Sequence, residues 1–240
     1  MKRKIFAFIF AREGSKGIKN KNLAKLNGKP LLDYSINIAK KLDIFQKIYV
    51  CTDSKKISNY ARKKKVDIIL RPKRLATDNS PEYLSWKYAL NFLKKKKISF
   101  DVFVSLPTTS PLRETSDVLG ALNKLKNKTD FVVCASKARR NPWFNMLIKK
   151  KDGYYRLINS LKKKIPNRQN APEVYDLTTI CYISTPNFIL KNNSYHDGNL
   201  DIFVSKKINS IDIDEKIDLK IAEKLRNLKW LLLFQEHAVE

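Results

Sequence analysis

The chain has 240 residues, 43% of them hydrophobic and 10% aromatic, which is enough to bury one full core within a single large domain. Its formal net charge is +26, a value that first suggests a polyanion partner such as nucleic acid. The lysines lie in short scattered runs, without an RNP signature, a helix-turn-helix pattern or an arginine-rich tract, so we expect a solvated surface that attracts anionic substrates.

Other function classes find little support in the sequence. Two histidines, and three cysteines without CxxC spacing, argue against a zinc site, a histidine relay and a disulfide framework. The apolar run that follows the first four residues is too short for a signal sequence or a membrane span. We therefore expect a cytoplasmic protein without membrane association.

Apolar β-type runs alternate with helical patterns through the first half of the chain. This repetition predicts an α/β fold of the Rossmann-like kind, with a mostly parallel sheet covered by helices on both faces. The expected strands are Ile5 to Phe10, Ile48 to Thr52, Ile68 to Leu70, Val102 to Leu106 and Phe131 to Ala135, and the expected helices are Leu31 to Leu42, Lys55 to Lys65, Tyr83 to Leu93 and Asp117 to Leu125.

The rhythm of strands and helices changes near Asn141. From there to Glu173, short aromatic segments alternate with lysine and proline, which indicates an arm (residues 141–173) inserted into one domain that spans residues 1–240. The remaining expected elements are the strands Thr178 to Ile183 and Phe203 to Val204, and a closing helix from about Glu215 to Lys229 in which Ile217, Ile221 and Leu225 recur every four residues.

Ligands of an open parallel sheet bind outside the carboxyl ends of its strands. The functional residues are therefore expected in segments that directly follow predicted strands. Those segments are Ala11 to Asn22, Thr52-Asp53, Pro107 to Arg113 and Asp212 to Asp214.

The first of these segments has the composition of a phosphate-binding loop. Gly14 and Gly17 let the backbone fold closely around phosphate oxygens with its N–H groups pointing inward. The loop matches neither GxxxxGK[ST] nor GxGxxG, so it fits neither an ordinary ATPase nor a dinucleotide enzyme. The alternative is a solvated turn. The residues expected to bind or neutralise a triphosphate are Ala11, Arg12, Gly14, Ser15, Lys16, Lys21 and Asn22.

Two carboxylates stand two residues apart near the end of the chain. On an extended segment Asp212 and Asp214 point the same way and could hold one hard cation. Asp212 with Glu215 also satisfies a capping pattern before the last helix, and both readings can hold at once.

An ordered set of motifs covers most of the chain. The motifs are Ala11-Arg12, Gly14-Ser15-Lys16-Gly17, Lys19-Asn20-Lys21-Asn22, Gly28-Lys29-Pro30-Leu31, Thr52-Asp53-Ser54, Leu70-Arg71-Pro72, Leu75-Ala76-Thr77-Asp78, Thr109-Ser110-Pro111-Leu112-Arg113 and Asp212-Ile213-Asp214. Together they resemble one family, the acylneuraminate cytidylyltransferases, also called CMP-sialic acid synthetases. That resemblance implies a nucleotide-diphospho-sugar transferase fold, Mg²⁺ on Asp212 and Asp214, CTP contact by Arg71, and a homodimer formed through the arm.

The sugar side departs from the resembled enzymes. Pro107 stands where those enzymes usually carry a glutamine that meets the sugar, and Thr178-Thr179 replaces their Asn-Gly. The resemblance assigns Thr109 and Ser110 to the sugar. It also offers Arg168-Gln169 in the arm as a fork for the sugar carboxylate, within one chain or across a dimer interface, and the alternative is an exposed arginine in a lysine-rich arm. These departures indicate a related nonulosonic acid, such as a legionaminic-type sugar, as an alternative acceptor.

The expected reaction is attack by the anomeric hydroxyl of an acidic nine-carbon sugar on the α-phosphate of CTP, with pyrophosphate leaving. Arg12, Lys21, Asp212 and Asp214 would carry it, the aspartates through Mg²⁺ and the cations by stabilising phosphate charge. The alternatives are a CMP-Kdo-type or other sugar nucleotidyltransferase and, from another class, a basic nucleic-acid-binding protein.

Overall fold

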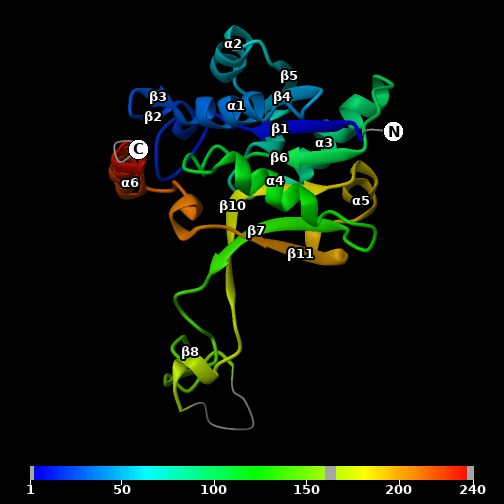
Figure 1. Ribbon diagram of the computed structural model, residues 1–240. Coiled ribbons are helices and arrows are strands. Elements are labelled where there is room, and N and C mark those ends of the chain that lie inside the picture. The colour runs from blue at the N-terminus through cyan, green and yellow to red at the C-terminus, as the bar shows by residue number, and fades with distance from the viewer. Residues whose placement is uncertain (1–2, 160–165, 237–240) are drawn as a thin grey trace.

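A computed structural model describes residues 3–159 and 166–236 and shows an α/β body with a long projecting arm (Figure 1). The strands of the central sheet are β1 (Ile5–Phe10), β4 (Lys47–Thr52), β5 (Asp67–Leu70), β6 (Val102–Ser105), β7 (Phe131–Lys137), β10 (Tyr175–Ser184) and β11 (Leu200–Val204). Their order is β11-β7-β10-β6-β1-β4-β5. All neighbours run parallel except β10, which is antiparallel to both β6 and β7. The expected mostly parallel α/β fold is confirmed.

Strand β1 shows why both faces of the sheet are covered. Side chains alternate along a strand, so Phe6, Phe8 and Phe10 pack on one face while Ala7 and Ile9 pack on the other. The phenylalanine face is covered by α3 (Glu82–Lys95) and α5 (Pro186–Lys191), and the opposite face by α1 (Leu31–Leu42), α2 (Lys55–Lys63) and α4 (Thr115–Lys124).

A third, smaller core joins segments that are far apart in the sequence. Ile18 from the first loop and Leu112 from the loop after β6 pack against Ile213 and against Ala222 of the last helix, α6 (Lys216–Glu236). Ile217 and Ile221, two of the three residues that repeat along this helix, are instead 55% and 42% exposed. Ile213, which is buried in this small core, lies between the two expected metal ligands, Asp212 and Asp214, and fixes their segment against the first loop.

A tight hairpin that sequence reasoning did not expect precedes α1. Strands β2 (Lys25–Leu26) and β3 (Lys29–Pro30) are joined by Asn27 and Gly28, which have φ values of 45° and 77°. Asn-Gly is the pair that two-residue hairpins favour, because both positions need positive φ. The hairpin turns the chain from the first loop into α1.

The expected arm projects from the sheet between β7 and β10 (Figure 1). It contains a small hairpin of β8 (Leu147–Lys149) and β9 (Tyr155–Leu157), and the long strand β10 leads back into the sheet. Residues 160–165 of the expected arm lie outside the described residues. Within the part of the chain that the structure describes, no helix is both long enough and apolar enough to cross a membrane.

Candidate active site

A cleft of about 310 Å³ lies at the carboxyl ends of β1, β5 and β6, where ligands of a parallel sheet are expected. Its wall draws on residues within 10–22, 71–85 and 107–109, on Thr179, and on residues within 212–214. Of the site residues expected from the sequence, the cleft brings together Arg12, Ser15, Lys21, Asn22, Arg71, Thr109, Asp212 and Asp214.

The other expected site residues lie elsewhere. Ala11 is buried and continues the β1 ladder, because its N–H donates to the Cys51 carbonyl. Ser110 is buried behind the cleft wall, whereas Gly14 and Lys16 stand exposed at its edge. Arg168 and Gln169 line a second hollow, of about 330 Å³, on the arm. One chain therefore does not bring the arm residues to the cleft.

A cluster of opposite charges holds one side of the cleft. Arg12 pairs with Asp78 at 2.6 Å and also donates to the Ala76 carbonyl, while Lys16 lies 3.6 Å from the same carboxylate. The hydrogen bond from Arg12 lowers the pKa of Asp78 below its usual range. Asp78 thus orients the cations and lies apart from the start of α3, whose N-cap is Pro81.

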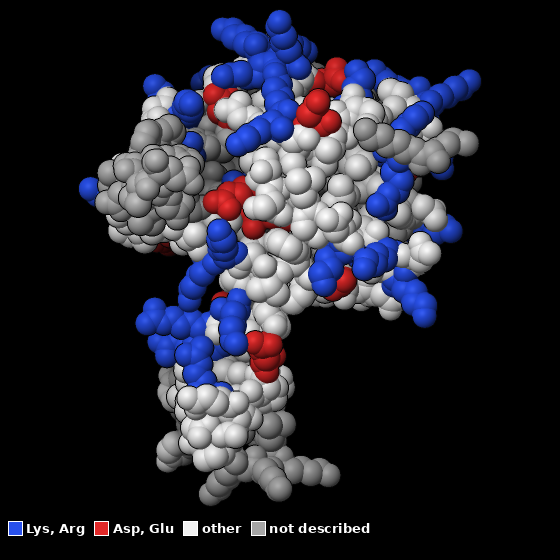
Figure 2. All heavy atoms as spheres, viewed as in Figure 1, with Lys and Arg blue, Asp and Glu red and all other residues white. Residues whose placement is uncertain are grey.

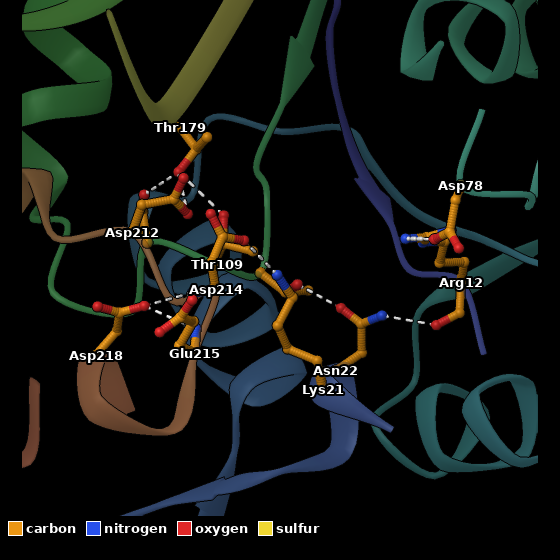
Figure 3. Close-up of polar contacts among 12 residues, drawn as sticks. Arg12, Lys21, Asn22, Asp78, Thr109, Thr179, Asp212, Asp214, Glu215 and Asp218 are labelled. Atoms are coloured by element: carbon orange, nitrogen blue, oxygen red, sulfur yellow. Dashed lines mark hydrogen bonds and ion pairs between the residues drawn. The ribbon is translucent and has the colours of Figure 1, made fainter. Parts of the chain in front are cut away.

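The end of the first loop is braced from within. The Asn22 side-chain amide N–H donates to the Arg12 backbone carbonyl at 2.8 Å (Figure 3), and the Thr108 hydroxyl donates to the side-chain oxygen Oδ1 of Asn22. Asn22 is buried. It therefore fixes the loop that carries Arg12, a structural task that its residue type alone did not reveal.

Arg71 forms a buried end of the cleft. Its backbone N–H donates to the Thr52 carbonyl, and its guanidinium donates to the Ser85 hydroxyl at 2.6 Å. The side chain is only 8% exposed, yet its Nε has no partner among the described residues. A buried guanidinium with an unused donor can still bind a ligand oxygen at low cost in ordering.

The two aspartates lie side by side on the opposite wall. Ile213 between them is buried and donates its N–H to the Thr109 carbonyl, so both carboxylates face away from the core and line the cleft. The expectation that this segment directly follows a strand is wrong, since the 3₁₀ helix Lys207–Ser210 intervenes. That helix lets the chain leave the sheet edge and cross to the first loop.

The start of α6 is capped by a different carboxylate. The backbone N–H groups of Asp214 and Glu215 donate to Asp218, at 3.0 and 2.7 Å (Figure 3). Asp212 instead accepts a hydrogen bond from Thr179 at 3.0 Å. The capping alternative for Asp212 is therefore not what the structure shows.

The carboxylates suit a hard cation. Burial raises the pKa of Asp212, the nearby charge of Asp214 adds to the rise, and hydrogen bonds from Thr109 and Thr179 oppose it. Mg²⁺ is usually held by one or two carboxylates, with substrate phosphates and water completing its shell. No group of three or more His, Cys, Asp or Glu side chains suited to a metal occurs among the described residues, so the adjacent pair Asp212 and Asp214 is the carboxylate group that could hold such a cation with help from substrate and water.

Two features of the site escaped sequence reasoning. Glu82 lines the cleft and also a side pocket of about 250 Å³, and its carboxylate accepts from the Trp86 indole N–H. Burial raises the pKa of Glu82. The walls of that side pocket include Tyr83, Trp86, Tyr182 and Tyr195. In the sequence Glu82 is indistinguishable from an acidic residue that favours the first turn of a helix.

The surface charge does not form one continuous track on the face seen in Figure 2. Lysines and arginines lie there in separate groups, on the upper part of the body, where Figure 1 places α2, and on the arm. Such a spread is typical of a solvated basic surface, whereas a nucleic-acid groove gathers its charge along one path.

A loop rich in cations, a buried arginine and a carboxylate pair, all brought to one edge of a mostly parallel sheet, together characterise a nucleotidyltransferase. Residues 6–237 match the family described as Cytidylyltransferase, and the chain belongs to that family.

Relatives and solved structures agree with this placement. The chain is 34% identical to the post-translational flagellin modification protein B of Campylobacter coli over 92% of its own length and 94% of that protein. It is 32% identical to the CMP-N,N'-diacetyllegionaminic acid synthase of Campylobacter jejuni over 94% of its length and 96% of that protein. A solved CMP:2-keto-3-deoxy-manno-octonic acid synthetase in complex with CTP has the same fold, with a TM-score of 0.71, 13% identity, and coverage of 94% of this chain and 99% of that one.

Proposed function

We propose that the protein transfers CMP from CTP to the anomeric hydroxyl of a nonulosonic, sialic acid-like sugar in a Mg²⁺-dependent reaction that releases pyrophosphate. The observation that carries this proposal is the contact between Lys21 and Asp214, which lie 2.8 Å apart. It joins the end of the phosphate-type loop directly to the carboxylate pair. A nucleotide phosphate held by that loop would therefore also meet a cation held by Asp212 and Asp214.

The protein's own side chains account for binding and charge. Arg12 and Lys21 neutralise phosphate oxygens, and the partly exposed Arg12–Asp78 pair can exchange its carboxylate for a phosphate. Arg71 closes the buried end of the cleft. Bound Mg²⁺ would supply charge neutralisation on the phosphates and make the attacking hydroxyl more acidic. Transfer of this kind depends on position and charge more than on covalent catalysis.

A legionaminic-type acid fits the acceptor side better than N-acetylneuraminate. Pro107 and Thr179, the two departures from the resembled sialic acid enzymes, both line the cleft. One relative with nearly full coverage is named for N,N'-diacetyllegionaminic acid. The sugar-binding side of the cleft differs from that of the resembled sialic acid enzymes, whereas the nucleotide-binding side matches theirs. This combination supports a related but different acceptor sugar.

The test is a pyrophosphate-release screen of CTP, UTP and GTP against legionaminic, N-acetylneuraminic and Kdo-type acids. We expect release with CTP and a nonulosonic acid, with the highest kcat/KM for a legionaminic-type acid, and loss of release when EDTA removes Mg²⁺. A preference for the Kdo-type acid would favour the rival synthetase. No release from any pair, together with a salt-sensitive gel shift on RNA, would favour the nucleic-acid-binding alternative.

We also propose that the arm forms a homodimer and carries Arg168 and Gln169 to the partner's cleft, where they bind the sugar carboxylate. Large apolar side chains are exposed on the arm, including Leu147, Tyr154 and Tyr155 at 61%, 73% and 63%. Exposed apolar groups gathered on one projection are typical of a contact surface. Among the described residues of one chain, Arg168 donates to the Ala138 carbonyl beside the second hollow.

Mixing two inactive variants tests this arrangement. Arg168→Ala loses the arm contact and Asp212→Asn loses the metal ligand, so each alone should be nearly inactive. Random mixed dimers contain one complete site, and the refolded mixture should recover about a quarter of wild-type activity. A mixture no more active than its parents would show that the arm serves its own chain or no site at all.

A further inference from the structure

The structure gathers three hydroxyl groups around one of the two cleft aspartates (Figure 3). The Thr179 hydroxyl oxygen lies 3.0 Å from that of Thr109, 2.7 Å from that of Ser110 and 3.0 Å from Asp212 Oδ1. These residues come from the loop after β6, from β10 and from the segment before α6. Thr179 contacts both hydroxyl groups of the loop after β6 and also the aspartate.

An irregularity in β10 turns Thr179 toward the cleft. The strand pairs with β7 up to Thr178 and again from Tyr182, and Thr179 lies in the interruption. Bulges of this kind re-aim side chains and are frequent beside active sites. Thr179 lines the cleft, whereas the neighbouring Thr178 is 6% exposed and its hydroxyl has no partner among the described residues.

The direction of each hydrogen bond follows from the chemistry of the groups. A hydroxyl donates one proton and accepts two, and an ionised carboxylate only accepts. The single Thr179 proton therefore goes to Asp212, and the Ser110 hydroxyl donates to Thr179. Thr109 lies beside both the Thr179 hydroxyl and the Asp212 carboxylate, so the position of Asp212 Oδ1 is coupled to two residues of the loop after β6.

We propose that Thr179 is a positioning residue that holds the Asp212 carboxylate in the orientation needed to bind the catalytic cation. The inference rests on the proposed function, in which Asp212 and Asp214 hold Mg²⁺. An aspartate that is already oriented loses less rotational freedom when the metal binds.

The adjacent threonines provide a matched test. Thr179→Val keeps the branched shape and removes the donor, and we expect it to raise the Kd for Mn²⁺ by about 10- to 100-fold, as loss of a support to a metal ligand typically does. Thr178→Val makes the same change at a hydroxyl without a partner, and its Kd should stay at the wild-type value. Thr179→Ser restores the donor and should restore most of the affinity.

The measurement is Mn²⁺ binding by electron paramagnetic resonance in the presence of a non-hydrolysable CTP analogue, with thermal melting to confirm folding. Thr179→Ala replaces the valine variant if that one does not fold. Equal Mn²⁺ affinity in the Thr179 and Thr178 variants would overturn the positioning role. If wild-type protein binds no Mn²⁺ yet releases pyrophosphate, the metal assignment fails and the inference with it. If it does neither, the proposed function itself fails.

Discussion

Asp212→Asn is expected to lower the rate of pyrophosphate release by roughly 10³-fold while the protein stays folded. The amide keeps the volume of the carboxylate and can still meet the Thr179 hydroxyl, but it removes one of the two negative charges of the Asp212 and Asp214 pair. The measurement is a coupled assay of pyrophosphate from CTP with saturating acceptor, alongside a thermal melt.

Asp218→Asn is the matched control, because it removes the same charge six residues away. Asp218 accepts from the backbone N–H groups of Asp214 and Glu215, and an asparagine oxygen can accept the same bonds. We expect activity within about twofold of wild type and a stability loss below about 1 kcal/mol from the weaker charge at the helix N-terminus. Similar losses in both variants would mean that net charge, not ligation by Asp212, governs the reaction.

The order and kind of the main elements could be predicted because the chain is locally consistent. Strand β1 has the bounds that its continuous apolar run predicts, and helix α1 has the bounds that its helical spacing predicts. The small elements are another matter. The N-cap of helix α5 is Thr185, whose side chain accepts a hydrogen bond from the Phe188 N–H, and Pro186 is the first residue of the helix. This is a readable start signal, but the helix is too short to show a periodic apolar face.

The strand-end rule and the resemblance together anticipate much of the cleft. Arg12 follows β1 and Arg71 follows β5, so the topology alone places them at one edge of the sheet. Asp212 and Asp214 follow no strand. They reach the same edge because Ile213 packs into the small core that also holds Ile18 and Leu112. These contacts join residues that are far apart in the sequence, so no local sequence pattern encodes them.

Contacts between loops limited the rest of the prediction. Thr109 and Ser110 look alike in the sequence, yet one lines the cleft and the other is buried behind it, where its hydroxyl meets Thr179. Which of two neighbouring hydroxyls faces a ligand depends on the loop backbone and on the residues packed beneath it. Thr179 was recognisable as a departure in sequence, but its bond to Asp212 joins segments that meet only in the folded chain.

Of the two glycines in the first loop, Gly17 is the one at which an added methyl group, in Gly17→Ala, should most reduce stability and activity. A Cβ at Gly17 would stand 2.1 Å from the backbone carbonyl oxygen of Asp214 and 3.2 Å from its carbonyl carbon. Backbone at that distance must move, at a cost of about 1–3 kcal/mol for overpacking. Because the displaced segment carries both aspartates, and a shift of roughly 1 Å can cost about 10²-fold in rate, we expect activity to fall by that order.

Gly14→Ala separates this close approach from the flexibility of the loop. An added Cβ at Gly14 meets nothing within 4 Å, so its melting temperature should stay at the wild-type value or rise slightly as the unfolded chain loses freedom. Gly17→Ala should melt about 2–4 °C lower for each kcal/mol lost. Equal melting temperatures and full activity in the Gly17 variant would show that the loop and the aspartate segment can separate without harm. A lower melting temperature and lower activity in the Gly17 variant alone would show that the close approach at Gly17 holds the first loop against the segment that carries the two aspartates.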